Sequence, residues 1–529
     1  MDYRVLVTDK LAPEGIAILE EAEGIGVDYR PGLDPAELIS ILGNYDALLV
    51  RSGTKVTAEV VAAAGDCLKV IGRAGIGVDN VDIDAASKRG IVVMNTPTGN
   101  NVTTAEHTVS MMLALARHIP QANASLRSGQ WQRGDFVGTE VCNKTLGIIG
   151  IGNIGSIVAD RANGLRMKVV AYDPYITTEA ASRLGIELVD LDVLYARADF
   201  ISVHTPLTEE TRGLVGRQAF ASMKTGVRII NCARGGIVDE DALVEAIEEG
   251  KVAGAALDVF AEEPLSPGHR LVALPQVVAT PHLGASTGEA QLNVAIEIAR
   301  QVSDFLIDGV IKNAVNAASV SSEVADTLLP YALLAERIGS LHAQLAGCVP
   351  DEVTIEYQGE VTEMDLRPVN AAVLKGLLAS VLDFAVNTVN APILAKERGI
   401  KVVEMRTSDV SAFASAIKVT FKGGKGSSVI AGAVFGGRIA RLVRFDDFHC
   451  EAVPEGIILI LRNRDVPGVV GRVGTFLAEH NVNIAGLELG RVGGQAISFV
   501  HIDSPLSGEQ LAALRDLPDI TAANMVRLD

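Results

Sequence analysis

The chain has 529 residues, and at roughly 100–200 residues per domain this length predicts three or four domains. Hydrophobic residues make up 48% and charged residues 21%, which is the composition of a globular protein and excludes a disordered or fibrous chain. The 46 Lys and Arg against 65 Asp and Glu give a net charge of −19. Because such a field repels phosphate backbones and anionic lipid, we expect neither nucleic-acid nor membrane partners.

The cysteines and the N-terminal residues indicate the compartment. Five cysteines are few and odd in number, and they lack metal-ligand spacing: Cys67, Cys142, Cys232, Cys348 and Cys450. This pattern argues against a disulfide framework and against a metal site, and it is typical of a reducing environment. The start M-D-Y-R-V-L-V-T-D-K has no apolar signal core, and no uncharged apolar run reaches the ~18 residues of a membrane span. We therefore expect a soluble, cytoplasmic protein.

The first 97 residues predict a compact α/β unit. Four apolar runs are each typical of a buried strand in a parallel sheet: R-V-L-V-T-D, D-A-L-L-V-R-S, L-K-V-I-G-R and I-V-V-M-N. Amphipathic helical patterns separate them, and Thr96-Pro97 closes the unit. Thr103 with Glu106 then predicts a capping box at the start of a helix.

A second α/β unit is predicted from K-T-L-G-I-I-G to about residue 280. Its strands are L-G-I-I, V-V-A-Y-D, F-I-S-V-H, R-I-I-N-C, A-A-L-D-V-F and V-V-A-T. A capping box of Ser286 with Glu289 opens a long amphipathic helix. We expect this helix to return to the first unit and to make that domain discontinuous.

Beyond about residue 315 the pattern changes. A helix is predicted over 322–346, followed by alternating segments such as V-T-I-E-Y-Q and I-K-V-T-F-K, which indicate antiparallel strands with one wet face. From residue 454 the order β-α-β-β-α-β predicts a ferredoxin-like unit.

The sharpest local motif is G-I-G-N-I-G, between an apolar strand and a helical pattern. Gly150 permits a tight turn, Gly152 lets the backbone approach a pyrophosphate, and Gly155 lets helix and strand pack closely. Asp173 ends the next strand, 21 residues after Gly152, where a carboxylate accepts ribose hydroxyls and repels a 2′-phosphate. The motif predicts a dinucleotide site that prefers NAD to NADP.

A second glycine-rich stretch, R-A-G-I-G-V-D-N at 73–80, lacks the third glycine and an acid at the right distance. We interpret it as an interdomain loop whose amides face a small anion, with a purely structural turn as the alternative.

Three side chains of catalytic type follow predicted strands. Arg234, Glu263 and His282 stand where strand carboxyl ends face a ligand crevice in a doubly wound sheet. An imidazole can take the hydroxyl proton of a secondary alcohol, a carboxylate can fix its tautomer, and a guanidinium suits a substrate carboxylate. The alternatives are a surface salt bridge, a solvated acid and a helix cap, respectively.

These motifs carry a family resemblance. G-I-G-N-I-G, Y-D-P, N-C-A-R-G-G-I-V-D-E, A-L-D-V-F-A-E-E-P and T-P-H-L-G-A-S resemble the D-isomer-specific 2-hydroxyacid dehydrogenases, and R-S-G-T, G-R-A-G-I-G-V-D-N and M-N-T-P-T-G-N-N agree with this. The whole chain resembles the long, three-domain members of this family. That implies two Rossmann-like doubly wound parallel-sheet domains, an α+β intervening domain and a ferredoxin-like ACT domain.

The implied domains have stated boundaries. They are a discontinuous substrate-binding domain (1–97 plus 288–315), an NAD-binding domain (98–287), an intervening, allosteric substrate-binding domain (316–453) and an ACT regulatory domain (454–529).

The resemblance also implies residue roles. Arg234 holds the substrate carboxylate, Glu263 supports the histidine, and His282 exchanges the proton. The implied NAD contacts, beyond the three glycines, are Asn153, Ile154, Asp173, Thr205, Cys232, Ala233, Arg234, Asp258, His282, Leu283, Gly284 and Ala285. The expected substrate contacts are Arg51, Ser52, Gly53, Asn100, Trp131 and Arg133, with Trp131 as an interface anchor in the alternative. His107 and His204 match no catalytic position and are interpreted as structural.

In the last segment, D-V-P-G enters a helix and N-V-N-I enters a strand. By resemblance, Asp465 and Asn483 bind L-serine between paired ACT domains of a homodimer or homotetramer. The alternative is dimer packing without a ligand.

The resemblance implies NAD-dependent oxidation of 3-phospho-D-glycerate to 3-phosphohydroxypyruvate, the first step of L-serine biosynthesis, with feedback inhibition by L-serine. One alternative is a dehydrogenase of another D-2-hydroxy acid, such as glycerate. A further alternative is an NAD-sensing corepressor without enzymatic activity, against which the complete acid–base set argues.

Overall fold

The computed structural model describes residues 2–317, 322–347, 349–382, 384–407, 415–424 and 426–528. Cys348 therefore lies outside the described residues. Contacts within the chain divide it into two units, Met1–Asn95 with Ile298–Asp529, and Thr96–Glu297. The four-domain division expected from the sequence is finer than this and stays a prediction.

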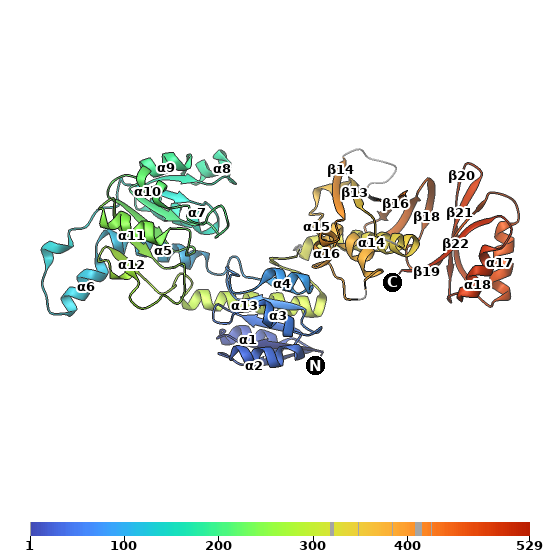
Figure 1. The fold of residues 1–529 in the computed structure, drawn as a ribbon, viewed down its shortest axis with the longest axis horizontal. Coiled ribbons are helices and arrows are strands. Elements are labelled where there is room, and N and C mark those ends of the chain that lie inside the picture. The colour runs from blue at the N-terminus through green and yellow to red at the C-terminus, as the bar shows by residue number, and fades with distance from the viewer. Residues whose placement is uncertain are drawn as a thin grey trace. The chain divides into compact units, whose positions relative to one another are not determined.

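The first unit begins with a five-stranded parallel sheet of order β2-β1-β3-β4-β5 (Figure 1). Its strands are β1 (Tyr3–Val7), β2 (Ile25–Tyr29), β3 (Ala47–Val50), β4 (Val70–Arg73) and β5 (Val92–Met94). Its helices are α1 (Pro13–Glu21), α2 (Pro35–Ile41), η1 (Leu42–Asn44), α3 (Ala58–Ala63) and α4 (Ile83–Lys88). The four predicted strands are confirmed. Strand β2 was not predicted, because I-G-V-D-Y is a half-buried edge strand without a continuous apolar run.

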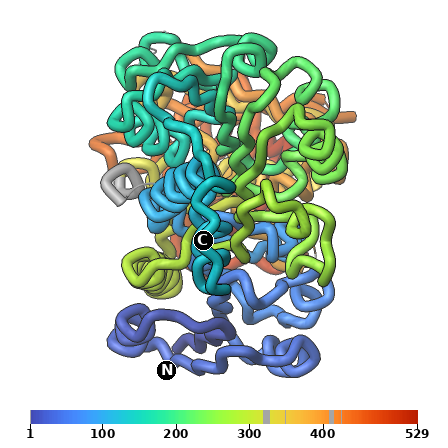
Figure 2. Tube along the Cα trace, turned by 90° about the vertical axis from the view of Figure 1, so that its left-hand side faces the viewer, coloured from blue at the N-terminus to red at the C-terminus, as the bar shows by residue number. Residues whose placement is uncertain are grey.

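Helix α13 (Gly288–Asp308) returns to this sheet, as expected. A Cβ built on Gly72 of β4 would meet the side chains of Val302 and Ile298, so the second half of α13 packs directly on the strand. In Figure 2 the yellow-green α13 comes back to the blue N-terminal segment. The division between the units falls inside this helix. The hydroxyl that accepts an N–H bond at its start is that of Thr287, from Ala290, so the predicted capping box at Ser286 is wrong by one residue.

The second unit is built on a seven-stranded parallel sheet of order β12-β11-β10-β9-β6-β7-β8. Its strands are β6 (Thr145–Ile149), β7 (Lys168–Tyr172), β8 (Glu187–Leu188), β9 (Phe200–Val203), β10 (Val227–Asn231), β11 (Val252–Leu257) and β12 (Val277–Ala279). Its further elements are α5 (Asn101–Ala116), α6 (Ile119–Arg127), η2 (Arg133–Phe136), α7 (Asn153–Gly164), α8 (Thr178–Arg183), α9 (Leu191–Arg197), α10 (Arg217–Ser222), α11 (Glu240–Glu248) and α12 (Arg270–Ala273). The predicted strands are confirmed.

The predicted capping box at the start of α5 is wrong. The helix already begins at Asn101, so Thr103 lies inside its first turn rather than before it. Its hydroxyl lies 3.3 Å from that of Thr287 instead of accepting a helix N–H.

The segment after residue 321 begins with α14 (Ser322–Ala346), the bounds that the sequence predicts. The following sheet has the order β14-β13-β15-β16-β17-β18 and is antiparallel except for the parallel pair β13–β14. Its strands are β13 (Glu352–Gly359), β14 (Lys401–Thr407), β15 (Ser415–Gly423), β16 (Gly426–Phe435), β17 (Ile439–Phe445) and β18 (Phe448–Ala452), and its helices are η3 (Glu360–Glu363), α15 (Arg367–Ala379) and α16 (Ala391–Glu397).

The last segment has the predicted ferredoxin-like order. It contains β19 (Gly456–Arg464), α17 (Val469–Glu479), β20 (Ile484–Val492), β21 (Gln495–Ile502), α18 (Gly508–Arg515) and β22 (Ile520–Leu528), with the sheet order β20-β21-β19-β22. Helices α17 and α18 lie on one side of this sheet (Figure 1). On the other face, Ile460 and Phe499 share one core with Phe445 and Phe448 of the preceding sheet. One face of the ferredoxin-like sheet is therefore covered by its own helices, and the other packs against the preceding sheet.

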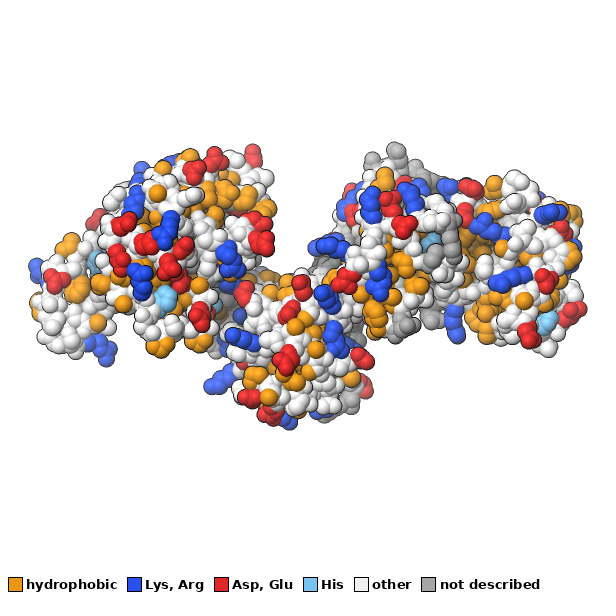
Figure 3. All heavy atoms as spheres, viewed as in Figure 1, with side chains coloured by type: hydrophobic (Ala, Val, Ile, Leu, Met, Phe, Trp, Pro, Cys, Tyr) orange, Lys and Arg blue, Asp and Glu red, His pale blue; other side chains and the backbone are white. Residues whose placement is uncertain are grey.

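The surface carries both signs of charge. On the face shown in Figure 3, acidic and basic side chains are interspersed, so the net charge is not gathered there in one patch. Within the described ranges, no helix is long and apolar enough to cross a membrane. The four described cysteines are free thiols.

Helices α14 and α15 cross with their backbones in direct contact. A Cβ built on Gly376 would clash with the carbonyl oxygen of Glu336, and one on Gly339 with that of Val373. Only glycine permits this approach, because a backbone carbonyl cannot swing aside as a long side chain can.

We therefore predict that Gly376→Ala destabilises the protein by about 2 kcal/mol or more, even though alanine is the better helix former. The matched control is Gly471→Ala in α17, where no atom lies within 4 Å of the added Cβ. Thermal unfolding of the full chain measures both variants. Equal midpoints for the two would contradict a close backbone crossing.

Candidate functional site

The glycine turn between β6 and α7 leaves open space at the start of the helix. Gly150 has φ +95°, and a Cβ on it would lie 2.7 Å from the carbonyl oxygen of His204. A Cβ on Gly155 would clash with the carbonyl of Gly150, whereas nothing lies within 4 Å of one on Gly152. Two glycines thus serve packing, and the third leaves the N-terminal amides of α7 open to an anion.

Asp173 directly follows β7 and is fixed beside this turn. One carboxylate oxygen accepts the N–H of Ile151 at 2.7 Å, and the other accepts that of Tyr175 at 2.8 Å. Each oxygen keeps lone-pair capacity for another donor, as binding of two ribose hydroxyls requires.

Two further predicted cofactor residues, Thr205 and Cys232, follow β9 and β10 at the same edge of the sheet. The Thr205 hydroxyl is buried and has no hydrogen-bond partner within the protein. Burial and the nearby Asp258 carboxylate raise the pKa of the Cys232 thiol to about 12, so this thiol stays protonated and unreactive. An orphaned buried hydroxyl beside an open glycine turn fits a bound dinucleotide.

Glu263 and His282 meet as predicted. The imidazole Nδ1 lies 2.6 Å from Glu263 Oε2, and the other oxygen of Glu263 accepts the N–H of Phe260 at 3.0 Å. Half of the His282 side chain is exposed. With Nδ1 bonded to the carboxylate, Nε2 is the ring nitrogen available for proton exchange.

Each partner shifts the pKa of the other. The hydrogen bond to Glu263 raises the pKa of His282 above its usual value, and this effect outweighs desolvation. Burial alone would raise the pKa of Glu263, but hydrogen bonds from His282 and the Phe260 N–H outweigh burial and lower it. The pair is therefore an imidazole of increased basicity held by an ionised carboxylate.

Arg234 stands at the end of β10 in a turn that Asn231 shapes. The buried Asn231 amide accepts the N–H of Ala233 at 3.0 Å and donates to the carbonyl of Arg234 at 2.8 Å. The positive charge of Arg234 acts to lower the pKa of His282. The neighbouring strands β10, β11 and β12 thus bring Arg234, Glu263 and His282 to one sheet edge.

Sequence reasoning missed two supports of this edge. Asn231 was included only as a strand residue, and His107 was interpreted as structural. His107 Nε2 lies 3.2 Å from the carboxylate of Asp258, a contact that agrees with a structural role. No local pattern signals this contact, since 151 positions separate the two residues.

The predicted substrate residues of the first unit lie in a loop after β3 that side-chain hydrogen bonds hold in place. Asp9 accepts the N–H groups of Arg51 at 2.6 Å and Thr54 at 3.1 Å, and a Cβ on Gly53 would lie 2.6 Å from that carboxylate. The amide of Asn80 donates to two carbonyls of the same loop. Sequence reasoning also missed Asp9 and Asn80.

The other predicted substrate residues belong to the second unit. Asn100 is buried at the start of α5, and its side-chain oxygen has no partner within the protein. Arg133 lies in η2, and Trp131 before it is 81% exposed. The structure thus shows Trp131 as a large apolar side chain open to solvent.

Each predicted effector residue is paired with another side chain of its own domain. Asp465 pairs with Arg491 at 2.6 Å, and Asn483 donates to Asp503 at 2.8 Å. Both pairs are at the surface of the ferredoxin-like unit.

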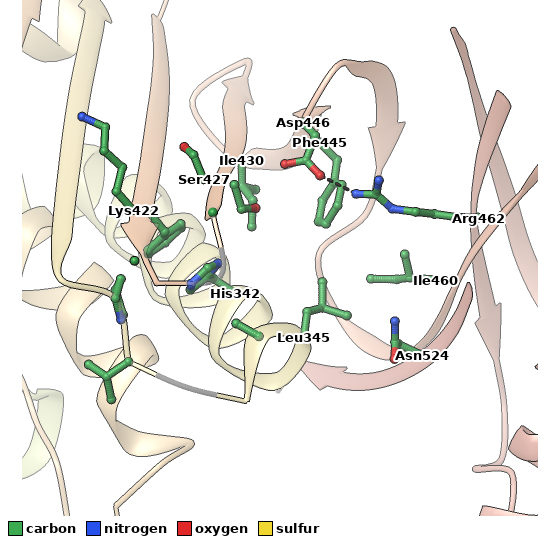
Figure 4. A pocket seen from close by; sticks show the side chains of 17 residues that line it. His342, Leu345, Lys422, Ser427, Ile430, Phe445, Asp446, Ile460, Arg462 and Asn524 are labelled. Atoms are coloured by element: carbon green, nitrogen blue, oxygen red, sulfur yellow. Dashed lines mark hydrogen bonds and ion pairs between the residues drawn. The ribbon is translucent and has the colours of Figure 1, made fainter. Parts of the chain in front are cut away.

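The first unit also has a cavity of about 400 Å³ between the sheet of β15–β17 and strands β19 and β22 (Figure 4). Its charged groups already have partners, Arg462 on Asp446 and Lys422 on Glu352. His342 stacks on Phe421, and burial lowers its pKa to about 4, so it is neutral. None of the predicted site residues lines this cavity.

Comparison with known families gives three matches along the chain. Residues 109–284 match the NAD-binding domain of D-isomer specific 2-hydroxyacid dehydrogenases. Residues 327–446 match the D-3-phosphoglycerate dehydrogenase intervening domain, and residues 457–519 match the ACT domain.

Full-length relatives and solved structures agree. The D-3-phosphoglycerate dehydrogenase of Synechocystis is 45% identical over 528 residues, covering 99% of this chain and 95% of that protein. That of Bacillus subtilis is 41% identical, covering 99% and 100%. The D-lactate dehydrogenase of Aquifex aeolicus, solved with NAD and lactic acid, is 29% identical with a TM-score of 0.53, covering 60% of this chain and 100% of that one. A Thermus thermophilus protein is 37% identical with a TM-score of 0.55, covering 59% and 99%.

The contact between Glu263 and His282 predicts a measurable titration. Glu263→Gln removes the carboxylate that stabilises the imidazolium, so the pKa of His282 should fall toward or below its usual value. NMR titration of the histidine ring signals measures this, with Glu262→Gln as a matched control at the neighbouring acid. A His282 pKa that is equal in both variants would contradict the pairing.

Proposed function

Because the chain belongs to the D-3-phosphoglycerate dehydrogenase family, we propose that it oxidises 3-phospho-D-glycerate to 3-phosphohydroxypyruvate. It is an NAD-dependent dehydrogenase of D-2-hydroxyacids. The reaction is the first step of L-serine biosynthesis. The observation that carries the proposal is the contact between Glu263 and His282, at the sheet edge where Arg234 also stands. Relatives of about the same length as this chain bear the name D-3-phosphoglycerate dehydrogenase.

The residues of the second unit fit NAD. The open turn at Gly152, the fixed carboxylate of Asp173 and the unpartnered hydroxyl of Thr205 would hold it, together with the further contacts expected above. NAD supplies the hydride acceptor when bound. The Asp173 carboxylate disfavours a 2′-phosphate and so favours NAD over NADP.

Proton transfer falls to His282. As the hydride leaves the substrate carbon, the hydroxyl O–H bond breaks, its proton passes to His282 Nε2, and the C–O bond becomes a carbonyl. Glu263 stabilises the imidazolium that results, because its carboxylate already bonds Nδ1 at 2.6 Å. The reverse reduction returns the same proton.

Arg234 would orient the substrate. Its planar guanidinium can bind a carboxylate through two parallel hydrogen bonds, a geometry that the point charge of a lysine cannot reproduce. Asn231 fixes the backbone on which this side chain stands. The remaining substrate contacts stay proposals from the sequence: Arg51, Ser52 and Gly53 of the first unit, and Asn100, Trp131 and Arg133 of the second.

The substrate is tested by steady-state turnover with NAD. We expect kcat/KM for 3-phospho-D-glycerate to exceed that for D-glycerate and D-lactate by about 100-fold or more, since a binding site built for a charged group rejects analogues that lack it. Arg234→Lys should raise KM for all three acids alike. Preference for an unphosphorylated acid would favour a dehydrogenase of another D-2-hydroxy acid.

For regulation, we propose that L-serine binds the ACT domain and inhibits the enzyme. Support comes from Asp465 at a strand-to-helix turn, beside the N-terminal end of α17, where amides can meet a carboxylate. Edge strand β20 exposes the apolar side chains of Ile484, Leu487, Leu489 and Val492. Such an edge favours pairing with a second copy, which agrees with a homodimer or homotetramer.

The regulation is tested by inhibition assays. Asp465→Ala and Asn483→Ala should each raise the L-serine concentration needed for half inhibition by about 10-fold or more, within the usual range of allosteric coupling. Asp516→Asn, an exposed acid on the same domain, is the control and should keep normal inhibition. Calorimetry on the unmodified protein that detects no L-serine binding would leave the ACT domain as a dimerisation module.

A further inference from the structure

Helix α5 contacts the turn that carries His282. The imidazole Nε2 of His107 lies 3.2 Å from Asp258 Oδ1 and 3.3 Å from the hydroxyl of Thr280. Thr104, one helical turn earlier, donates its hydroxyl to the carbonyl of Gly284 at 3.0 Å. One face of α5 therefore holds both ends of the segment 280–284.

Asp258 links His107 to this turn. Its side chain is fully buried, and it accepts the Thr280 hydroxyl at 2.5 Å and the N–H groups of Leu283 at 2.7 Å and Gly284 at 2.8 Å. A buried carboxylate requires such donors, because burial without them costs several kcal/mol. His107 adds a further donor, and it is the ion-pair partner of this carboxylate when protonated.

The backbone of His282 depends on the same acid. Its φ of +55° is in the left-handed region, which costs a non-glycine residue about 1–3 kcal/mol unless the surroundings impose it. The His282 N–H donates to the carbonyl of Asp258 at 2.9 Å, while the carboxylate holds the next two amides. A rotation of the Asp258 side chain would therefore release the turn and move the imidazole away from Glu263.

We propose that His107 is a positioning residue for the reaction, acting through the Asp258 carboxylate and the Thr280 hydroxyl to keep His282 in its reactive conformation. The inference rests on the proposed function, in that it concerns the same proton-transfer site. It assigns a positioning role to His107, which the sequence alone indicates only as a structural residue.

Three substitutions separate positioning from packing. His107→Leu removes the donor, His107→Gln keeps an N–H at the position of Nε2, and His107→Asn keeps one only at the position of Nδ1. Met112→Ala, a buried position on the same helix away from the turn, is the control for lost packing. Each variant is measured for kcat, for KM, for its unfolding midpoint and, without cofactor, for the His282 pKa by NMR.

We expect kcat to fall about 10- to 100-fold in His107→Leu, with KM of the hydroxy acid changed less than about threefold, because misplacement of a reacting group affects the chemical step. The His282 pKa should fall toward its usual value as the bond to Glu263 loosens. His107→Gln should restore kcat to within about threefold and restore the pKa, whereas Met112→Ala should lower only the unfolding midpoint.

Two results would overturn the proposal. One is a kcat of His107→Leu within about twofold of the unmodified protein, and the other is a His282 pKa that does not move. If His107→Leu does not fold, His107→Asn replaces it, and equal kcat values for His107→Asn and His107→Gln overturn the proposal. The assay uses whichever D-2-hydroxy acid the chain oxidises, and the titration needs none, so failure of the 3-phospho-D-glycerate assignment stays distinguishable.

Discussion

The reactive turn depends on one buried charge, the carboxylate of Asp258. A carboxylate without solvent is tolerated only where donors surround it, and here a hydroxyl, two backbone amides and an imidazole do so. Burial alone would raise the pKa of Asp258, but the hydrogen bonds from His107 and Thr280 outweigh burial and lower it, so the acid stays ionised. This anion fixes the two amides that follow His282 in a conformation that an isolated peptide would leave.

The parallel arrangement of the strands explains how residues far apart in the sequence come together at the candidate site. The carboxyl ends of β10, β11 and β12 lie next to one another, so the residues that follow them meet without any long-range loop. The ends of β6 and β7 place the glycine turn and Asp173 side by side, joined by the bond from the Ile151 N–H. The candidate cofactor site and the proposed acid–base pair are thus parts of one sheet edge.

The C-terminal segments obey a different constraint. The ferredoxin-like sheet packs one face against its own helices and the other against the preceding antiparallel sheet, with Phe445 and Phe499 in edge-to-face contact. Arg462 adds an ion pair to Asp446 and lies over the Phe445 ring. The two sheets therefore share one densely packed core.

The sequence by itself determined the parallel and ferredoxin-like patterns and most of the residues at strand ends, but not the half-buried edge strand β2. Periodicity, glycine spacing and strand termini are local, so Gly152, Asp173, Glu263 and His282 could be predicted as candidate site residues without coordinates. Only the tertiary structure decided which distant side chains support the candidate site. His107 contacts Asp258, Asn231 bonds to the turn of Arg234, and Asp9 bonds to the loop of Arg51. The physical reason is that a hydrogen bond requires closeness in space and not along the sequence. A hydrogen bond depends on a distance of about 3 Å in space, and residues 151 positions apart leave no local pattern that records it.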